Sequence, residues 1–306
     1  MPLSPNLRGA LFMVVAMIGF TLNDAITKFS SETMNMAQVM LVRGVFASLF
    51  VGLLAWHRGA LASPGTMLQP MVAVRVAGEA GATVSFLIAL AHLPIGNVSA
   101  VLQALPLAVT MGAALVFGEG VGWRRWLAIA VGFAGVLIIV RPGFEGFSVY
   151  SLLALTSVAC CAVRDLATKR IPQAIPTMLV STATALAMTV LGALLLSPMG
   201  GWTPMTGKAT ALLALAAVLV LIGYQFIIMA MRSGDISFIA PFRYTALLWS
   251  ILLGLVIFGD IPDLPMTIGA VIIIGSGLYA LYRERVVGRR QPAAESAGPD
   301  MAPDGI

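Results

Sequence analysis

The length and composition of this chain exclude an ordinary soluble protein. Of its 306 residues, 59% are hydrophobic before its 31 glycines are counted, and only 10% are charged. A soluble domain has about 45–50% apolar residues with glycine included, and about 25% charged residues. The net charge of +5 does not indicate a nucleic-acid partner, because the basic residues lie mainly in short segments between apolar runs. The chain therefore requires the lipid bilayer as its solvent.

Ten apolar runs are long enough to cross a bilayer as helices. A hydrocarbon core of about 30 Å takes about 20 helical residues. The runs also lack the alternation of barrel strands, so the chain is predicted to be an all-α integral membrane protein. The predicted helices lie near 9–27, 36–56, 70–91, 97–117, 124–140, 149–168, 176–196, 209–230, 237–258 and 265–282.

Two short motifs recur at a spacing of 141 residues and divide the chain into halves. Residues 23–28 (NDAITK) match 164–169 (RDLATK), and residues 117–119 (FGE) match 258–260 (FGD). Five helices per half is an odd number, so the second half must enter the membrane in the opposite sense. The sequence therefore predicts two inverted five-helix repeats, an arrangement typical of secondary transporters.

The basic residues of the short loops predict the orientation. With the N-terminus in the cytoplasm, eleven basic residues fall in cytoplasmic segments, against only Lys28, Arg141 and Lys208 on the opposite side. Because Lys and Arg are retained on the cytoplasmic side, both termini are expected there. They comprise residues 1–8 and the tail 283–306, whose Pro/Ala/Gly-rich composition from Gln291 onward predicts disorder.

The repeated motifs carry a family resemblance. With residues 240–249 (APFRYTALLW) and the run 269–282, the two Asp-x-x-Thr-Lys segments and the two Phe-Gly-acid ends resemble the drug/metabolite transporter superfamily. The similar branch is the one built from two EamA-type repeats, here residues 9–141 and 149–282. The resemblance covers about residues 8–285 and does not specify a substrate.

The resemblance implies a multi-pass carrier in a bacterial inner membrane that moves a small organic metabolite by alternating access. The first helix resembles members that transport flat, polar metabolites, including riboflavin and S-adenosylmethionine permeases. Uptake of a riboflavin-like vitamin is the first expectation, and export of an amino-acid-like metabolite or drug is the alternative. The resemblance also implies that the fifth and tenth helices lie away from the pathway. Protons are a possible coupling ion, and the oligomeric state stays open.

Other function classes lack their sequence signatures. The chain contains no His-Glu-x-x-His helix, no Gly-x-Ser-x-Gly turn and no Walker loop, so an intramembrane enzyme is a weaker alternative and no cofactor is expected. Its only cysteines, Cys160 and Cys161, and its only histidines, His57 and His92, do not have the spacing of a metal site. No metal is therefore predicted.

Charged residues inside the predicted spans are the candidate functional residues, because a charge at bilayer depth usually faces a cavity or a partner. Arg75 and Glu79 lie four residues apart on the third span, where they could pair directly. Glu79 is interpreted either as a substrate or proton site or as part of a structural pair. Arg43 in the second span is expected to pair with Asp24 or with Glu79.

A second group of candidates lies on the fourth, eighth and ninth spans. Arg243 and Gln103 lie at nearly equivalent depths, and Tyr244 follows Arg243 directly. Arg243 either clamps a substrate carboxylate or phosphate or bonds helix-end carbonyls. Tyr224 is a further candidate for substrate contact. We predict that Glu79, Gln103 and Arg243 line one water-accessible cavity between the halves.

Two charge pairs recur at the ends of the first and sixth spans. Asp24 and Lys28 are spaced as an i,i+4 pair, and Asp165 and Lys169 repeat this spacing in the second half. These pairs either set the depth of the helices, because charges near an interface can reach water, or act as gates that close the two entrances alternately.

The predicted orientation can be tested with reporter fusions. Reporters fused after Gly59, Arg125 and Arg290 should read cytoplasmic, and those after Pro94 and Met199 should read external. The measurement is the activity of a reporter pair that is active on opposite sides of the membrane. A cytoplasmic signal after Pro94 would contradict the ten-span topology.

Overall fold

The molecule is an all-helical bundle over the residues that the structure describes. The computed structural model describes residues 4–57, 69–118, 120–143, 147–172, 174–233 and 236–286. Within these ranges no strand occurs, and ten spans are long and apolar enough to cross a membrane. The all-α prediction with ten spans is thereby confirmed. Glu119 of the FGE motif and most of the predicted tail lie outside the described residues.

Eight spans are uninterrupted helices whose bounds lie close to the predicted ones. Prolines mark several starts: Pro5 opens the first helix behind the Ser4 cap, and Pro70 opens the third. The eight helices are α1 (Pro5–Ser31), α2 (Met36–His57), α3 (Pro70–His92), α6 (Trp123–Val140), α7 (Val149–Lys169), α8 (Thr177–Leu196), α9 (Gly207–Ser233) and α12 (Leu264–Val286).

The other two spans are broken, whereas the sequence predicted continuous helices over 97–117 and 237–258. The fourth span is α4 (Ile95–Leu102) followed by α5 (Leu105–Phe117). The ninth is α10 (Ile236–Ile239), η2 (Ala240–Tyr244), α11 (Thr245–Leu253) and η3 (Gly254–Phe258). Pro106 and Pro241 account for the breaks, because proline lacks the N–H donor and its ring clashes with the preceding turn.

The repeated Phe-Gly-acid motif has a structural explanation. Gly118 and Gly259 end the fourth and ninth spans with left-handed backbone, at φ values of 66° and 69°. A residue with a side chain adopts this conformation at a cost, so glycine is preferred as the residue after a helix end. The two glycines are 141 residues apart, so both halves end this span in the same way.

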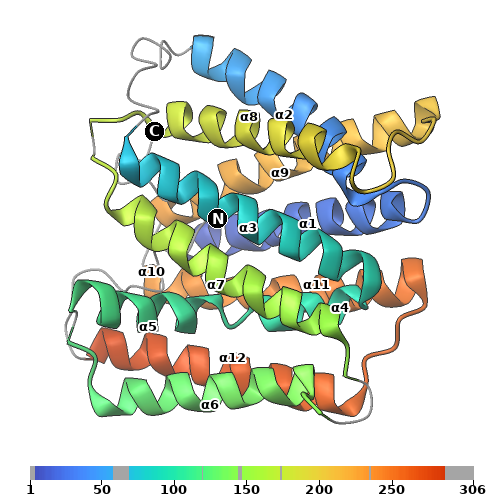
Figure 1. The fold of residues 1–306 in the computed structure, drawn as a ribbon. Coiled ribbons are helices and arrows are strands. Elements are labelled where there is room, and N and C mark those ends of the chain that lie inside the picture. The colour runs from blue at the N-terminus through green and yellow to red at the C-terminus, as the bar shows by residue number, and fades with distance from the viewer. Residues whose placement is uncertain are drawn as a thin grey trace.

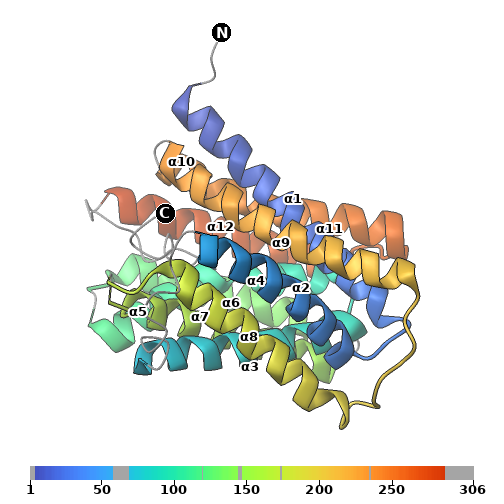
Figure 2. The ribbon, with the colours of Figure 1, turned by 90° about the horizontal axis from the view of Figure 1, so that it is seen from above.

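Helices pair across the two halves in a symmetric pattern (Figures 1 and 2). The most extensive pairings are α1 with α9, α3 with α7, α2 with α8 and α6 with α12. Exchanging the halves converts the first pairing into the second and leaves the other two unchanged. Figure 1 shows α2 and α8 at one edge of the molecule and α6 and α12 at the opposite edge.

Individual contacts obey the same 141-residue relation. Ser48 Oγ lies 3.0 Å from Thr189 Oγ1, and these residues are 141 positions apart. Equivalent residues touch only where they lie next to a two-fold axis, so the axis passes between α2 and α8. Because each half crosses the membrane an odd number of times, this axis lies in the membrane plane, and the repeats are inverted.

Close helix packing across the halves can be tested at a glycine. A Cβ atom on Gly192 of α8 would lie 2.7 Å from the Leu41 backbone nitrogen, whereas one on Gly52 of α2 would meet nothing within 4 Å. Gly192→Val should therefore force α8 away from α2, at a cost of roughly 1–3 kcal/mol, and lower the melting temperature by several degrees. Gly52→Val is the matched control and should leave the melting temperature in detergent nearly unchanged. Equal melting temperatures for the two variants would contradict the packing.

Candidate functional site

A cavity of about 730 Å³ lies between the two halves of the bundle. It is lined by helices of both repeats, and among the described residues α6 and α12 contribute nothing to it. Many of the polar residues singled out in the sequence border this one space. These are Asp24, Arg43, Arg75, Glu79, Gln103, Tyr224, Gln225 and Arg243.

The cavity reaches one side of the bundle and ends near its middle. We call the side where α1 begins the N-terminal side, and the side where α1 ends the far side. Leu54 at the end of α2 and Thr177 at the start of α8 line the cavity on the N-terminal side. Toward the far side the lining ends at Asp24 and Phe86, each more than one helical turn from the end of its helix.

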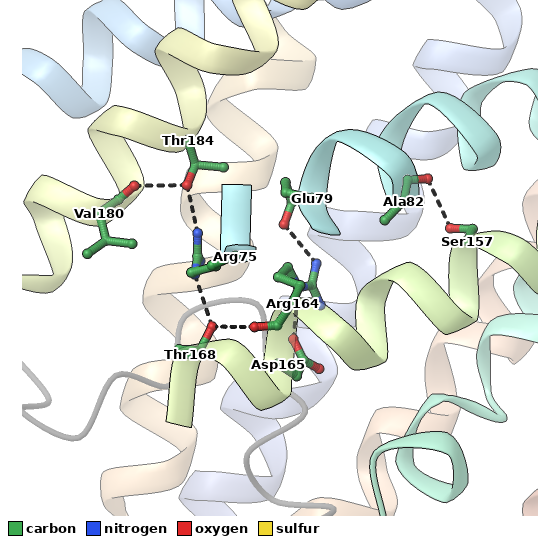
Figure 3. Close-up of polar contacts among 9 residues, drawn as sticks. All are labelled: Arg75, Glu79, Ala82, Ser157, Arg164, Asp165, Thr168, Val180 and Thr184. Atoms are coloured by element: carbon green, nitrogen blue, oxygen red, sulfur yellow. Dashed lines mark hydrogen bonds and ion pairs between the residues drawn. The ribbon is translucent and has the colours of Figure 1, made fainter. Parts of the chain in front are cut away.

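The centre of the polar lining is an arginine that the sequence analysis did not propose as a site residue. Arg164 of α7 donates from Nη1 to Glu79 Oε2 at 3.1 Å and from Nε to Asp165 Oδ1 at 2.8 Å (Figure 3). The exposed fractions of the Arg164, Glu79 and Asp165 side chains are 7%, 18% and 1%. A charged residue directly before Asp165 was the available signal, but the segment was used only to align the repeats.

Arg75 lies one helical turn before Glu79 and connects three helices. Its Nε donates to Thr168 Oγ1 of α7 at 3.1 Å, and its Nη1 donates to Thr184 Oγ1 of α8 at 2.7 Å (Figure 3). The sequence suggested a direct pair between Arg75 and Glu79, and the structure adds partners from the second half for both residues. These contacts connect α3 to the opposite repeat.

Arg43 and Asp24 are connected through an amide. Arg43 Nη1 donates to Asn23 Oδ1 at 3.1 Å, and Asn23 Nδ2 donates to Asp24 Oδ1 at 2.9 Å. The expected direct pairing of Arg43 with Asp24 or Glu79 is therefore replaced by a bridge through Asn23. The neighbouring position was overlooked because asparagine carries no charge.

Lys28 closes the bundle on the far side instead of pairing with Asp24. Its Nζ donates to Leu90 O at 3.1 Å and also to Leu93 O, and it lies 5.3 Å from the centre of the Phe258 ring. The expected i,i+4 pair is thus wrong, because unsatisfied carbonyls at the end of α3 are closer partners for the ammonium. In the second half, Asp165 likewise bonds Arg164 and not Lys169.

The corresponding contact on the N-terminal side uses the next basic residue. The Arg170 guanidinium lies 4.5 Å from the centre of the Phe117 ring, and Phe117 is equivalent to Phe258 in the repeat. The two sequence motifs therefore meet in space, each basic helix end against the aromatic end of the other half. Both contacts have the geometry of a cation–π interaction.

Two predicted substrate contacts differ in their surroundings. Tyr224 borders the cavity, with its ring 5.1 Å from that of Phe20 in an edge-on arrangement. Tyr244 is not among the lining residues: it is buried, and its hydroxyl packs against Gly277 of α12. The turn of η2 directs Arg243 to the cavity and its neighbour away from it. No group of three potential metal ligands gathers among the described residues.

The fold and the cavity agree with the proteins that this chain is similar to. The model of the EamA-like transporter family matches residues 7–141 and 149–282. The chain is 30% identical to a riboflavin transporter of Rhizobium johnstonii, covering 93% of this chain and 94% of that protein. It is 26% identical to a pseudopaline exporter of Pseudomonas aeruginosa, covering 87% and 93%, and 25% identical to an S-adenosylmethionine uptake transporter of Rickettsia prowazekii, covering 92% and 95%.

The family model covers both halves separately, in agreement with the two structural repeats. A match over nearly the whole chain, together with ten membrane spans, identifies the class of protein. This chain is a member of the EamA-like transporter family, and it is a multi-pass membrane protein that transports a small molecule.

Proposed function

We propose that the cavity between the repeats is the substrate site of a carrier that works by alternating access. The observation that carries the proposal is the asymmetry of the cavity, which reaches the N-terminal side and stops short of the far side. An inverted repeat can exchange the conformations of its halves. In the opposite state, the cavity would open on the far side and close on the N-terminal side.

The basic helix ends are the proposed gates of this cycle. On the far side, Lys28 holds the carbonyls at the end of α3 and faces Phe258. Its repeat equivalent Lys169, on the N-terminal side, would make the corresponding contacts at the end of α9 in the opposite state. This exchange closes one entrance whenever the other opens.

Riboflavin-like vitamins are the first substrates to test. The similarity to a riboflavin transporter extends over nearly the whole chain, and the cavity offers polar and aromatic groups suited to a flat, polar molecule. Export of an amino-acid-like metabolite is the second candidate, because four arginines line the cavity and guanidinium groups bind carboxylates. We propose transport rather than catalysis, in a bacterial inner membrane with both termini in the cytoplasm.

Arg243 provides a direct test of the site. Arg243→Ala should abolish riboflavin uptake into proteoliposomes while membrane expression stays normal, because a cavity cation that contacts substrate is removed without loss of a spanning helix. Arg124→Ala is the matched control, since Arg124 is exposed at the start of α6, away from the cavity. Normal uptake by well-expressed Arg243→Ala would refute the assignment of Arg243. Uptake of an amino-acid-like metabolite alone would select the second candidate.

A proton is the proposed coupling ion, and two carboxylates line the cavity to receive it. Glu79→Gln and Asp24→Asn each remove one of them. The variant that lacks the coupling site should transport at the same rate with and without an imposed proton gradient, because a neutral amide carries no proton through the cycle. Glu32→Gln at the exposed end of α1 is the control. If both cavity variants still respond to the gradient, neither carboxylate is the coupling site.

A further inference from the structure

The charged side chains that line the cavity are unequal in number. Four arginines border it, namely Arg43, Arg75, Arg164 and Arg243, against two carboxylates, Asp24 and Glu79. A third carboxylate, Asp165, lies behind Arg164 and is almost fully buried. Positive charge therefore exceeds negative charge among the described lining residues, even when Asp165 is included. An excess charge in a low-dielectric space is stabilised by a ligand of opposite sign.

Arg164 is built to present one edge of its guanidinium group. Asp165 Oδ1 holds Nε at 2.8 Å from behind, while Glu79 Oε2 takes Nη1 at 3.1 Å. Among the described residues, Nη2 has no hydrogen-bond partner. The fork of Nη1 and Nη2 is the edge that binds a carboxylate or phosphate with two parallel hydrogen bonds. Only one oxygen of Glu79 makes an ion pair there.

Glu79 is the residue that a ligand would have to replace. It comes from α3 of the first half, whereas Arg164 and Asp165 share α7 of the second. If Glu79 moves away, Asp165 still holds the guanidinium in position, and Arg75 remains one helical turn from the vacated place. Arg75 is held by Thr168 and Thr184, so a second cation stays beside the site.

From these contacts we propose that Arg164, held by Asp165, is the subsite for an anionic group of the substrate, and that Glu79 occupies this subsite when the carrier is empty. The inference rests on the proposed carrier function and narrows its substrate class to molecules with a carboxylate or phosphate. The exchange involves no covalent step: the substrate anion takes the two Nη donors, and the Glu79 carboxylate turns into the cavity. An empty carrier thus avoids leaving a guanidinium unpaired between its cycles.

A purely structural ion pair makes different predictions from an exchangeable one. If the pair only joined α3 to α7, neutralising Glu79 would destabilise the protein and leave ligand preference unchanged. If Glu79 competes with the substrate, neutralising it removes a competitor and strengthens the binding of anions. Ligand preference therefore separates the two roles, and stability alone does not.

The experiment compares matched pairs of probes on the full-length protein in lipid nanodiscs. Riboflavin and riboflavin 5′-phosphate differ by a phosphate, and decarboxylated S-adenosylmethionine and S-adenosylmethionine differ by a carboxylate. In at least one pair, the wild-type protein should bind the more anionic member at least about tenfold more tightly. Glu79→Gln should strengthen that binding by a further factor of about ten and leave the other member unaffected. The pair that responds identifies phosphate or carboxylate as the anionic group.

Two further variants complete the test. Arg164→Lys keeps the positive charge but loses the planar fork, so the preference for the anionic member should fall to about threefold or less. Glu32→Gln is the control for Glu79→Gln and should behave as wild type. Equal binding within both pairs, including no binding of any probe, would overturn the proposal, as would weaker anion binding by a well-folded Glu79→Gln. Transport of free riboflavin without this preference would leave the carrier function intact, whereas binding without transport would contradict the carrier function and not the subsite.

Discussion

The cost of a charge inside a bilayer determines how this bundle is assembled. A charged side chain at the centre of a membrane helix costs a few kcal/mol on insertion scales, and seven such residues occur in its spans around the cavity. All seven are placed between the halves and none on the lipid face. Glu79 of the first half meets Arg164 of the second, and Arg75 reaches Thr168 and Thr184. Charge burial therefore favours the docking of one repeat on the other.

The two-fold relation of the repeats gives these contacts their distribution. Ser48 and Thr189, which are equivalent positions, bond each other on the axis. Small residues bring the backbones together beside it: a Cβ on Gly78 would lie 3.1 Å from the Cys160 carbonyl oxygen, and one on Gly19 would lie 3.1 Å from that of Leu219. Moving positions 78 and 160 by 141 residues yields positions 219 and 19. Glycine thus occupies opposite partners of the same symmetric contact, in line with close packing as the main source of membrane helix association.

Symmetry also limits what the two ends of the molecule can do. The basic end of each repeat's first helix approaches the aromatic end of the other repeat's fourth span, as Lys28 does at Phe258 and Arg170 does at Phe117. The two contacts are not identical, because only Lys28 also bonds the carbonyls at the end of α3. A symmetric sequence in an asymmetric conformation is what a carrier needs, since the two sides must differ at any moment and be interchangeable over a cycle.

The sequence by itself determined the class, the spans and the repeat. Hydropathy places the helices because the bilayer demands about 20 apolar residues per crossing, and the bounds of α2, α3, α6, α7 and α8 agree with the predicted ranges to within one residue. The 141-residue spacing predicted the two-fold relation that Ser48 and Thr189 display. Prolines at positions 106 and 241 also held the signal for the broken spans, which hydropathy averaging over a long window conceals.

Only the tertiary structure decided which side chains meet. Spacing along one helix suggested pairs of Asp24 with Lys28 and of Asp165 with Lys169, but the observed partners are Asn23 for Asp24, α3 carbonyls for Lys28 and Arg164 for Asp165. Neighbours along a helix are set by a fixed period, whereas partners across helices depend on rotation and depth, which no local pattern encodes. For the same reason, the adjacent residues Arg243 and Tyr244 could not be assigned to the cavity or to α12 until η2 was seen between them.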